Sequence, residues 1–296
     1  MNNYTLGPVI GEGQFGHVRM ATVKATGQPV AVKLIHVPRL MEGIPHPVAR
    51  ELLIASRVGS PFLVNTIEII PYRSHMAIVM ERCVEDLASV LRRCSPLQPL
   101  PPLLAQSYLR MLLTALHALH SGGMLHRDVK PANCFIASDG SLKLGDFGLS
   151  RPLSSDMSHE VVSRWYRAPE LLFGQRHYRG EVDVWAAGCV FAELLRGYGR
   201  PLFTGDGDIS QITKIFDVFG TPAGATYEVY RKLPDWEKVF FKEKKGTGLR
   251  VLLPFVPSEA LDLLTAMLAL DPAARCSAAE ALNHPFFALT NVALRA

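Results

Sequence analysis

The chain has 296 residues, of which 48% are hydrophobic and 20% are charged, and its formal net charge is +4. This length and apolar content are enough to fold into an enzyme of two lobes, and they exclude an intrinsically disordered chain. Basic residues are scattered apart from a short run at 242–245 that an acid interrupts, so we expect no nucleic-acid binding.

The cysteines and the apolar stretches bear on the cellular compartment. The five cysteines are odd in number and show no CxxC spacing, which argues against a disulfide framework and a zinc site and indicates a reducing compartment. Charges interrupt every apolar stretch before the roughly 20 residues that a membrane span needs, and the N-terminus lacks the pattern of a signal peptide. We therefore expect a soluble intracellular protein with no membrane insertion.

The first part of the chain predicts a small sheet followed by one helix. Residues 4–35 alternate apolar and polar side chains between glycines, as short antiparallel strands do. Residues 47–58 read as a helix, with proline at the start and Gly59 just past the end. We expect four residues to share the inward face of this helix: Val48, Glu51, Leu52 and Ala55.

The rest of the chain changes in character. Further strands fit residues 62–70 and 76–80, after which long segments with helical periodicity appear, such as 104–120 and 182–196. Residues 82–85 would form the hinge between these parts. We predict an α+β fold of two lobes, a small strand-rich lobe with one main helix and a larger helical lobe.

A glycine pattern, GxGxxG, lies in the first strands at Gly11, Gly13 and Gly16. Alone it is ambiguous, because the same pattern opens dinucleotide-binding folds or marks an ordinary turn. The residues from His17 to Met20 continue as a strand, whereas a dinucleotide-binding fold would enter a helix. A Walker-type phosphate loop is excluded, since no Gly-Lys-Ser/Thr follows.

Lys33 ends the apolar segment VAVK. The simplest interpretation is a lysine whose amine reaches solvent at a strand end. However, Glu51 on the inward face of the helix would be costly to bury without a partner. We therefore expect Lys33 and Glu51 to pair.

Three further motifs follow in order: HRDVKPAN at 126–133, DFG at 146–148 and APE at 168–170. With GxGxxG and VAVK at these intervals, the set resembles the eukaryotic protein kinases. The resemblance covers residues 4–287 and implies the bilobal kinase fold.

The resemblance also implies domain boundaries. The N-lobe would span residues 4–83, and the hinge and C-lobe would span 84–287. Residues 288–296 would form a short C-terminal tail.

The resemblance implies phosphoryl transfer from ATP with Mg²⁺, a reaction that needs positioning and countercharge more than covalent help. Asp128 would orient the substrate hydroxyl and accept its proton. Lys130, which is typical of serine/threonine kinases at this position, would neutralise charge near the transferred phosphate. Asn133 and Asp146 would supply the oxygen ligands that magnesium prefers.

The nucleotide pocket is also implied by the resemblance. Met80 would close its back, Glu81 and Cys83 would offer hinge backbone groups to adenine, and Phe135 would lie beneath the adenine. The other expected contacts come from the glycine-rich loop and its strands: Ile10, Gly11, Gly13, Gly16, Val18, Ala31 and Lys33.

Within the kinases, SHEVVSRWYRAPE from Ser158 is similar to the cyclin-dependent kinases. Mitogen-activated kinases carry Thr-x-Tyr here, whereas this chain has Glu160. The segments GIPHPVARE, LPDW with FKE, and SEALDLL look closest to the cell-cycle-related kinase branch. Gln14 and Phe15 stand where many relatives carry inhibitory Thr and Tyr, so that brake is expected to be absent.

This resemblance implies partners and a location. A cyclin or another activating subunit would bind. Cytoplasm and nucleus are the expected compartments, and the cell-cycle-related kinase branch is associated with cilia or flagella. Val162, Ser163 and Arg167 would form the pocket for the residue after the phosphoacceptor, which favours protein substrates with Ser/Thr-Pro.

Activation would depend on a phosphate. Singly, Arg50, Arg127 and Arg151 would be ordinary solvated arginines. As a set they match the cluster with which cyclin-dependent kinases hold an activation-loop phosphate. Ser158 matches the modified position, which implies an upstream activating kinase.

Two structural pairs are implied as well: Glu170 with Arg275, and Asp183 with the catalytic-loop backbone. Two alternatives remain open. A pseudokinase scaffold would keep the fold without transfer, although the set of catalytic residues is complete. A mitogen-activated type of kinase would need no partner subunit, which Glu160 disfavours.

Overall fold

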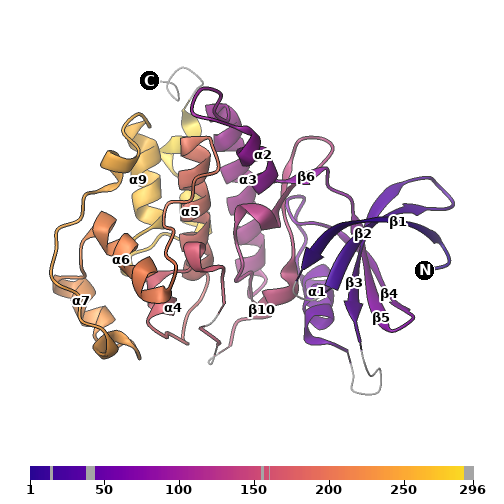
Figure 1. Cartoon of the computed structure of the whole chain (residues 1–296), viewed down its shortest axis with the longest axis horizontal. Helices are drawn as coiled ribbons and strands as arrows, with labels where there is room; N and C mark the ends of the chain where they lie inside the picture. Colours follow the sequence, from indigo (N-terminus) through magenta and orange to yellow (C-terminus); the bar gives the residue numbers. More distant parts are fainter. Residues whose placement is uncertain (14–15, 38–43, 155–156, 160, 290–296) are drawn as a thin grey trace.

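The computed structural model describes residues 1–13, 16–37, 44–154, 157–159 and 161–289. Figure 1 shows two lobes, with the strand-rich N-terminal part beside a larger helical part. The predicted α+β bilobal fold is therefore confirmed.

The N-lobe is built on one five-stranded sheet in the order β1-β2-β3-β5-β4, with antiparallel neighbours. Alternate residues of the central strand β3 face two different cores, because successive side chains of a strand point to opposite faces. Val32 and Leu34 belong to the core on one face, whereas Ile35 packs against Val48 on the other. The strands are β1 Tyr4–Gly13, β2 Gly16–Val23, β3 Pro29–His36, β4 Thr66–Tyr72 and β5 His75–Glu81.

Helix α1 spans His46–Arg57 and has proline in its first turn. Its buried stripe runs through Val48, Glu51 and Ile54. The expectation for Leu52 and Ala55 is wrong, since both are exposed. The helix packs against both the sheet and the DFG segment, so its buried stripe turns around the helix axis and leaves these two residues outside.

Strand β4 begins at Thr66, so the predicted start of this strand at residue 62 is also wrong. The backbone of residues 62–64 pairs with the other lobe instead. Val64 N–H donates to the Leu144 carbonyl at 2.9 Å, and Leu144 N–H donates to the Phe62 carbonyl at 2.8 Å. This segment therefore joins the N-lobe to the strand that precedes DFG.

The C-lobe is organised around helix α5, in which every residue from Val182 to Leu194 is buried. A helix that is buried all round forms the centre of a large core. In the part of the chain that is described, no helix is long and apolar enough to cross a bilayer. The helices are α2 Leu87–Arg93, α3 Pro102–Ser121, α4 Pro169–Leu172, α5 Glu181–Arg196, α6 Asp208–Phe219, α7 Gly224–Tyr230, α8 Leu249–Leu252, α9 Ser258–Met267 and α10 Ala278–Leu282.

Short elements place the motif residues between the lobes. The catalytic loop runs between β7 and β8, and DFG lies between β9 and β10. The strands are β6 Glu85–Asp86, β7 Met124–Leu125, β8 Cys134–Ile136, β9 Leu142–Leu144 and β10 Arg151–Pro152. The 3₁₀ turns are η2 Pro131–Asn133, η3 Phe147–Leu149, η4 Arg164–Tyr166, η5 Trp236–Lys238 and η6 Pro285–Ala288.

A buried ion pair fixes the end of the activation segment. Arg275 donates to both carboxylate oxygens of Glu170, at 2.7 and 3.0 Å, and also to the Glu181 carbonyl at 2.9 Å. Its guanidinium lies over the Trp185 ring, 5.0 Å from the centroid. The predicted pairing of Glu170 with Arg275 is confirmed.

Candidate active site

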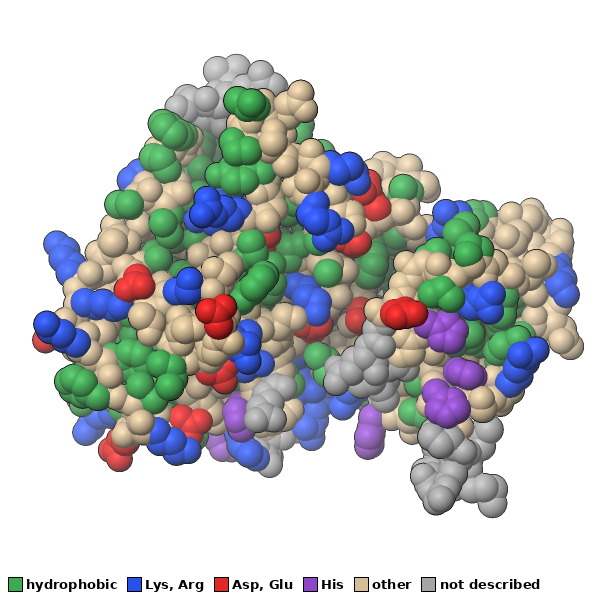
Figure 2. All heavy atoms as spheres, viewed as in Figure 1, with side chains coloured by type: hydrophobic (Ala, Val, Ile, Leu, Met, Phe, Trp, Pro, Cys, Tyr) green, Lys and Arg blue, Asp and Glu red, His purple; other side chains and the backbone are tan. Residues whose placement is uncertain are grey.

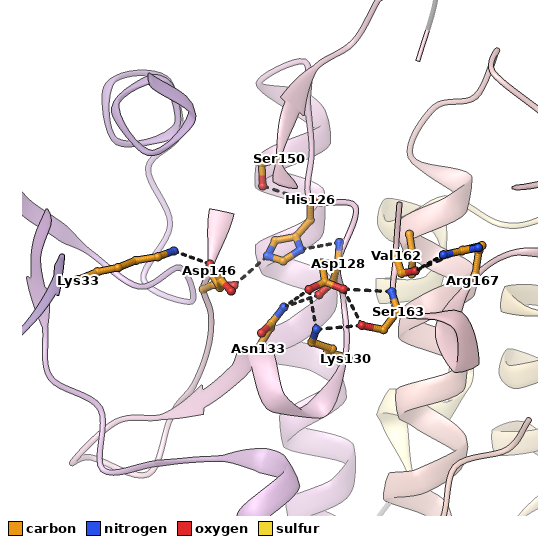
Figure 3. A network of polar contacts seen from close by, with 11 residues as sticks. Lys33, His126, Asp128, Lys130, Asn133, Asp146, Ser150, Val162, Ser163 and Arg167 are labelled. Carbon is orange, nitrogen blue, oxygen red and sulfur yellow. Dashed lines mark hydrogen bonds and ion pairs between the residues drawn. The ribbon is translucent and has the colours of Figure 1, made fainter. Parts of the chain in front are cut away.

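Asp128 is the centre of a polar network between the catalytic loop and the activation segment (Figure 3). Its Oδ2 accepts from Lys130 Nζ at 2.7 Å and from Asn133 Nδ2 at 2.9 Å. Its Oδ1 accepts from the N–H and the hydroxyl of Ser163, at 3.2 and 3.0 Å. Four donors thus hold the carboxylate in one orientation, beside a serine hydroxyl.

Lys130 ties the same two segments together. Besides Asp128, its ammonium donates to Ser163 Oγ at 2.9 Å. A hydroxyl placed next to Asp128 therefore has a carboxylate on one side and a positive charge on the other. This arrangement suits removal of a hydroxyl proton while negative charge develops nearby.

Asp183, in helix α5, binds the backbone of the catalytic loop. It is fully buried and accepts from the backbone N–H of His126 at 2.9 Å and of Arg127 at 2.8 Å. Burial raises the pKa of Asp183, but His120 at 2.9 Å and these hydrogen bonds lower it below its ordinary value. The expected contact with the loop backbone is confirmed, and it holds Arg127 at a left-handed φ of 65°.

His126 connects the loop to the DFG segment. Its Nδ1 accepts from the Asp128 N–H at 3.2 Å, and its Nε2 lies 3.0 Å from the Gly145 carbonyl. A carbonyl only accepts, so Nε2 carries the proton and the ring is the Nε2–H tautomer. The ring also meets Phe147 edge to face, with centroids 5.5 Å apart.

Lys33 contacts two carboxylates. Its Nζ lies 2.6 Å from Asp146 Oδ1 and 3.4 Å from Glu51 Oε1. The expected contact with Glu51 is therefore present, although Asp146 is the nearer partner. Burial lowers the pKa of Lys33, yet the two carboxylates raise it above its ordinary value, so the amine is charged at neutral pH.

The two carboxylates around Lys33 differ. Burial raises the pKa of Glu51 above its ordinary value despite the nearby amine. Burial also raises the pKa of Asp146, but Lys33 lowers it below the ordinary value, so Asp146 is charged at neutral pH. Asp146 sits at a left-handed φ of 58°, and its side chain is 42% exposed.

The donor set fits magnesium. Figure 3 shows Asp146 between Lys33 and Asn133. Asn133 uses its amide nitrogen to bind Asp128, which leaves its amide oxygen as the atom that could face a metal. No group of three or more His, Cys, Asp or Glu side chains forms a metal cage within the described ranges. Magnesium commonly takes one or two protein oxygens and completes its shell with phosphates and water, so this sparse set suits it.

Strand register brings together the residues predicted to contact the nucleotide. Val18 is the cross-strand partner of Lys33, and Ala31 is the partner of Met80, so these four lie close together in the sheet. Gly16 has a φ of 148°, and a Cβ there would lie 2.0 Å from the Leu34 carbonyl oxygen, so only glycine fits.

The remaining predicted nucleotide contacts are placed around this group. Gly11 lies in β1 opposite Val18, and Ile10 is half exposed. Phe135, in β8, is half-buried and packs against Gly145. Gly13 ends β1.

Some sequence predictions fall outside the described ranges. Gln14 and Phe15, which stand where many relatives carry inhibitory Thr and Tyr, are among them. Glu160, which separates this chain from the Thr-x-Tyr pattern, is another.

The hinge follows β5 as expected. The Glu81 N–H donates to the Asn65 carbonyl at 3.0 Å, so its own carbonyl is the backbone group left to offer to adenine. The Glu81 carboxylate accepts from Lys143 at 2.9 Å. Burial raises the pKa of Cys83 to about 11, so this hinge thiol is neutral at physiological pH.

Arg127 and Arg50 bind backbone carbonyls just after the DFG aspartate, and Arg127 also contacts Ser158. Arg127 donates to the Leu149 carbonyl at 2.9 Å, and its Nη1 lies 3.5 Å from Ser158 Oγ. Arg50 donates to the Gly148 carbonyl at 2.5 Å. Burial lowers the pKa of Arg50, and the positive charges of Arg127 and Arg151 lower it further.

Tyr178 is a member of this cluster that sequence reasoning missed. Its hydroxyl donates to the Ser158 carbonyl at 2.6 Å and accepts from Arg127 Nη1 at 3.3 Å. Tyr178 belongs to no motif, so nothing in the sequence signals this contact.

Val162 adopts a left-handed φ of 67°, which is strained for a β-branched residue. Its carbonyl accepts from Arg167 Nη2 at 3.1 Å, and the Val161 carbonyl accepts from Arg167 Nε at 2.8 Å. The carbonyl of Val162 is therefore directed at Arg167, next to Ser163 and the Asp128 carboxylate (Figure 3).

A buried acid below this segment predicts a pH effect on stability. Tyr166 donates to Glu193 Oε1 at 2.7 Å, and burial raises the pKa of Glu193 to about 7. Because the folded state holds this proton more tightly, the stabilisation is complete below the ordinary pKa of 4.5 and is lost as the pH rises to 7. As the pH rises from about 5.5 to 8, ionisation of Glu193 should lower the free energy of unfolding by about 2 kcal/mol.

Denaturant unfolding of the wild type and of Glu193→Gln at these two pH values measures the effect. The variant should lose less stability than the wild type as the pH rises, whereas Glu243→Gln, at an exposed position, should follow the wild type. Parallel pH profiles for all three proteins would contradict the assignment.

Comparison with known proteins places this site in context. Residues 4–287 match a family model described as the protein kinase domain. Cyclin-dependent kinase 20 of Rattus norvegicus is 39% identical over 292 residues, which cover 97% of this chain and 83% of the relative. Cyclin-dependent kinase D-1 of Arabidopsis thaliana is 41% identical over 289 residues, with 97% and 71% covered. Cell division control protein 2 homolog 3 of Trypanosoma brucei brucei is 40% identical over 291 residues, with 97% and 92% covered.

Proposed function

Because the chain belongs to the protein kinase family, in its cyclin-dependent group, we propose that it is a proline-directed kinase switched on by phosphorylation of Ser158 and by a partner subunit. Serine/threonine kinase activity follows from the family. The proposal covers three further points: the choice of substrate sequence, the use of ATP with Mg²⁺ at the residues described above, and the mode of activation.

The chain's own residues have separate tasks in this reaction. Asp128 accepts the proton of the substrate hydroxyl, in the orientation that Lys130, Asn133 and Ser163 impose. Lys130 balances the charge that develops beside it. Asp146 and Asn133 would hold Mg²⁺, which together with ATP would supply the phosphoryl group and a divalent countercharge.

Contacts among the catalytic residues favour an active enzyme over a scaffold. Lys33 contacts both Glu51 and Asp146, and Asp128 contacts both Lys130 and Asn133. A pseudokinase scaffold would need none of these contacts, and each one costs the ordering of two side chains.

The direction of the Val162 carbonyl is the observation that carries proline specificity. Since this carbonyl is bonded to Arg167, a substrate residue just after the phosphoacceptor would lack an acceptor for its N–H. An unpaired amide costs roughly 1–3 kcal/mol, whereas proline has no N–H to leave unpaired. Proline at this position therefore avoids a penalty that every other residue meets.

Three peptides that differ only in the residue after the acceptor serine test proline direction. We expect kcat/KM for Ser-Ala to be about 5- to 150-fold below that for Ser-Pro. A peptide with N-methylalanine, which also lacks the N–H, should recover much of the loss. Equal rates for Ser-Ala and Ser-Pro would contradict proline direction. If Ser-Pro is preferred but N-methylalanine does not recover the rate, the preference would come from the shape of the proline ring.

The arginine cluster is the observation that supports activation at Ser158. A phosphate there would bring a charge of about −1.5 to −2 next to Arg127, Arg50 and Arg151, which otherwise repel one another. Charge-assisted bonds from arginines of α1, the catalytic loop and β10 would hold these three elements together. The ordering of α1 would in turn keep Glu51 near Lys33.

Turnover before and after phosphatase treatment tests this activation. With Ser158 shown by mass spectrometry to be phosphorylated, dephosphorylation should lower turnover by roughly ten- to a hundredfold. Ser158→Ala should start at the low level and not respond to phosphatase, and Arg127→Ala should make the enzyme insensitive to the state of Ser158. Equal turnover of the phosphorylated and dephosphorylated wild type would show that Ser158 phosphorylation does not activate the enzyme.

A partner subunit is supported by the relatives' names and by exposed apolar residues at α1. Leu52 is 41% exposed and Ile44, just before the helix, is 59% exposed. Affinity purification of the tagged chain, with identification of bound proteins, tests for this subunit. Full activity of the phosphorylated monomer would favour the alternative, a mitogen-activated type of kinase that needs no partner.

A further inference from the structure

Three histidines from three strands of the N-lobe sheet lie against one another. His36 of β3 and His75 of β5 are direct cross-strand partners, and their ring centroids are 5.1 Å apart. His17 of β2 approaches the same ring of His75, with centroids 6.2 Å apart. Figure 2 shows histidine side chains gathered on the surface of this lobe.

One positive and one negative side chain border this cluster. Arg73, in the turn between β4 and β5, acts on His75 with the same sign as the other two imidazoles. The hydroxyl of Ser74 lies 3.3 Å from Nδ1 of His75. Among the described residues of the neighbouring strand β1, Glu12 is the register partner of His17. Protonation of the rings would therefore place three imidazolium groups and one guanidinium together.

The cluster adjoins the strands that carry the glycine-rich loop. His17 directly follows Gly16, whose backbone packs so closely on Leu34 that no side chain fits between them. The partner of His17 in β3 is Leu34, and the next pair along these strands is Val18 with Lys33. A change in the spacing of β2 and β3 at the histidines would thus reach the residues proposed to contact the nucleotide.

We propose that His17, His36 and His75 form an acid-sensitive switch, which separates the ends of β2, β3 and β5 and weakens nucleotide binding when the pH falls below neutral. The inference rests on the nucleotide site of the proposed function and adds a mode of regulation to it. Mutual repulsion of the protonated rings drives the change, since like charges directly opposite on neighbouring strands are destabilising.

The direction of the effect follows from linkage. Burial, together with His36, His17 and Arg73, lowers the pKa of His75 below its ordinary value of 6.5. The folded state therefore binds fewer protons than the unfolded state in this range. The contribution of neutral His75 to the stability of the folded strands is complete above pH 6.5. It is lost as the pH falls through the lower pKa of His75 in the folded state.

Binding of Mg²⁺–ADP at about pH 7.5 and 6.0, measured by calorimetry, tests the switch without requiring phosphoryl transfer. For the wild type we expect Kd to rise by about three- to tenfold at the lower pH. His75→Gln should abolish most of this rise, whereas His117→Gln, at an exposed position on α3, should match the wild type. Protonation of ADP itself contributes equally in all three proteins and cancels in the comparison.

Nuclear magnetic resonance of the imidazole Cε1–Hε1 groups gives a second readout. His75 should titrate below the ordinary range, and His36→Gln, at an exposed position, should move that titration upward. The proposal is overturned if ADP binding to His75→Gln depends on pH as strongly as binding to the wild type. It is also overturned if His36→Gln leaves the titration of His75 unchanged. No binding of ADP to the wild type at about pH 7.5 would instead contradict the proposed nucleotide site, while the titration of His75 would still decide whether the cluster is coupled.

Discussion

Asp128→Asn is expected to lower turnover on a Ser-Pro peptide by about 10²- to 10⁴-fold while leaving the affinity for Mg²⁺–ATP nearly unchanged. Asparagine has the shape of aspartate. With its oxygen toward Lys130 it can still accept from that ammonium, and its amide nitrogen can donate to Ser163 Oγ, but it cannot accept the proton of the substrate hydroxyl. The loss should therefore fall on the chemical step. Steady-state kinetics and a separate nucleotide-binding measurement distinguish the two quantities.

Asp146→Asn is the informative comparison for this variant. It removes the charged partner of Lys33 and the proposed metal ligand, so both binding of Mg²⁺–ATP and transfer should fail. Asp139→Asn, in an exposed turn after β8, serves as the matched control and should leave both quantities unchanged. Near-wild-type turnover of Asp128→Asn would show that another group accepts the proton.

Arg275→Met is expected to lower the free energy of unfolding by about 3–5 kcal/mol. The substitution leaves Glu170 buried without its two hydrogen bonds, and it also removes the donor to the Glu181 carbonyl. An uncompensated buried charge is far more costly than the loss of an exposed pair. Denaturant unfolding monitored by fluorescence measures the difference.

Two further variants separate this charge effect from simple loss of packing. Arg231→Met breaks an ion pair with Glu228 in which both side chains are 54% exposed, and it should cost no more than about 1 kcal/mol. The double variant Glu170→Gln, Arg275→Met should recover part of the loss, because no buried charge remains. If Arg275→Met and Arg231→Met were equally stable, the buried pair would have no special role.

Residues within one motif could be predicted from the sequence because the chain itself keeps them close. Asp128, Lys130 and Asn133 lie within six positions, so a single loop brings their side chains together. Asp183 and the pair of Glu170 with Arg275 are far apart in sequence, and there the kinase resemblance supplied the pairing that the structure shows.

Contacts outside the motifs could not be predicted in this way. Tyr178 contacts Ser158 and Arg127 from a segment without a sequence signal, and Glu193 contacts Tyr166 from the last turn of the buried helix α5. Periodicity alone also assigned Leu52 to the wrong face, since α1 packs against two elements rather than one. Such contacts depend on how elements are placed in three dimensions, which local patterns do not encode.

We expect this chain to transfer phosphate from Mg²⁺–ATP to serine or threonine through Asp128. The direct measurement is incorporation of labelled γ-phosphate into peptides that differ only in a Ser, Thr or Tyr acceptor before proline, with Asp128→Asn measured alongside. Transfer through Asp128 should label the Ser and Thr peptides and label the Tyr peptide little, and turnover of the variant should be lower by about 10²-fold or more. No transfer by the phosphorylated, partner-bound wild type, despite bound nucleotide, would contradict it and favour the scaffold alternative.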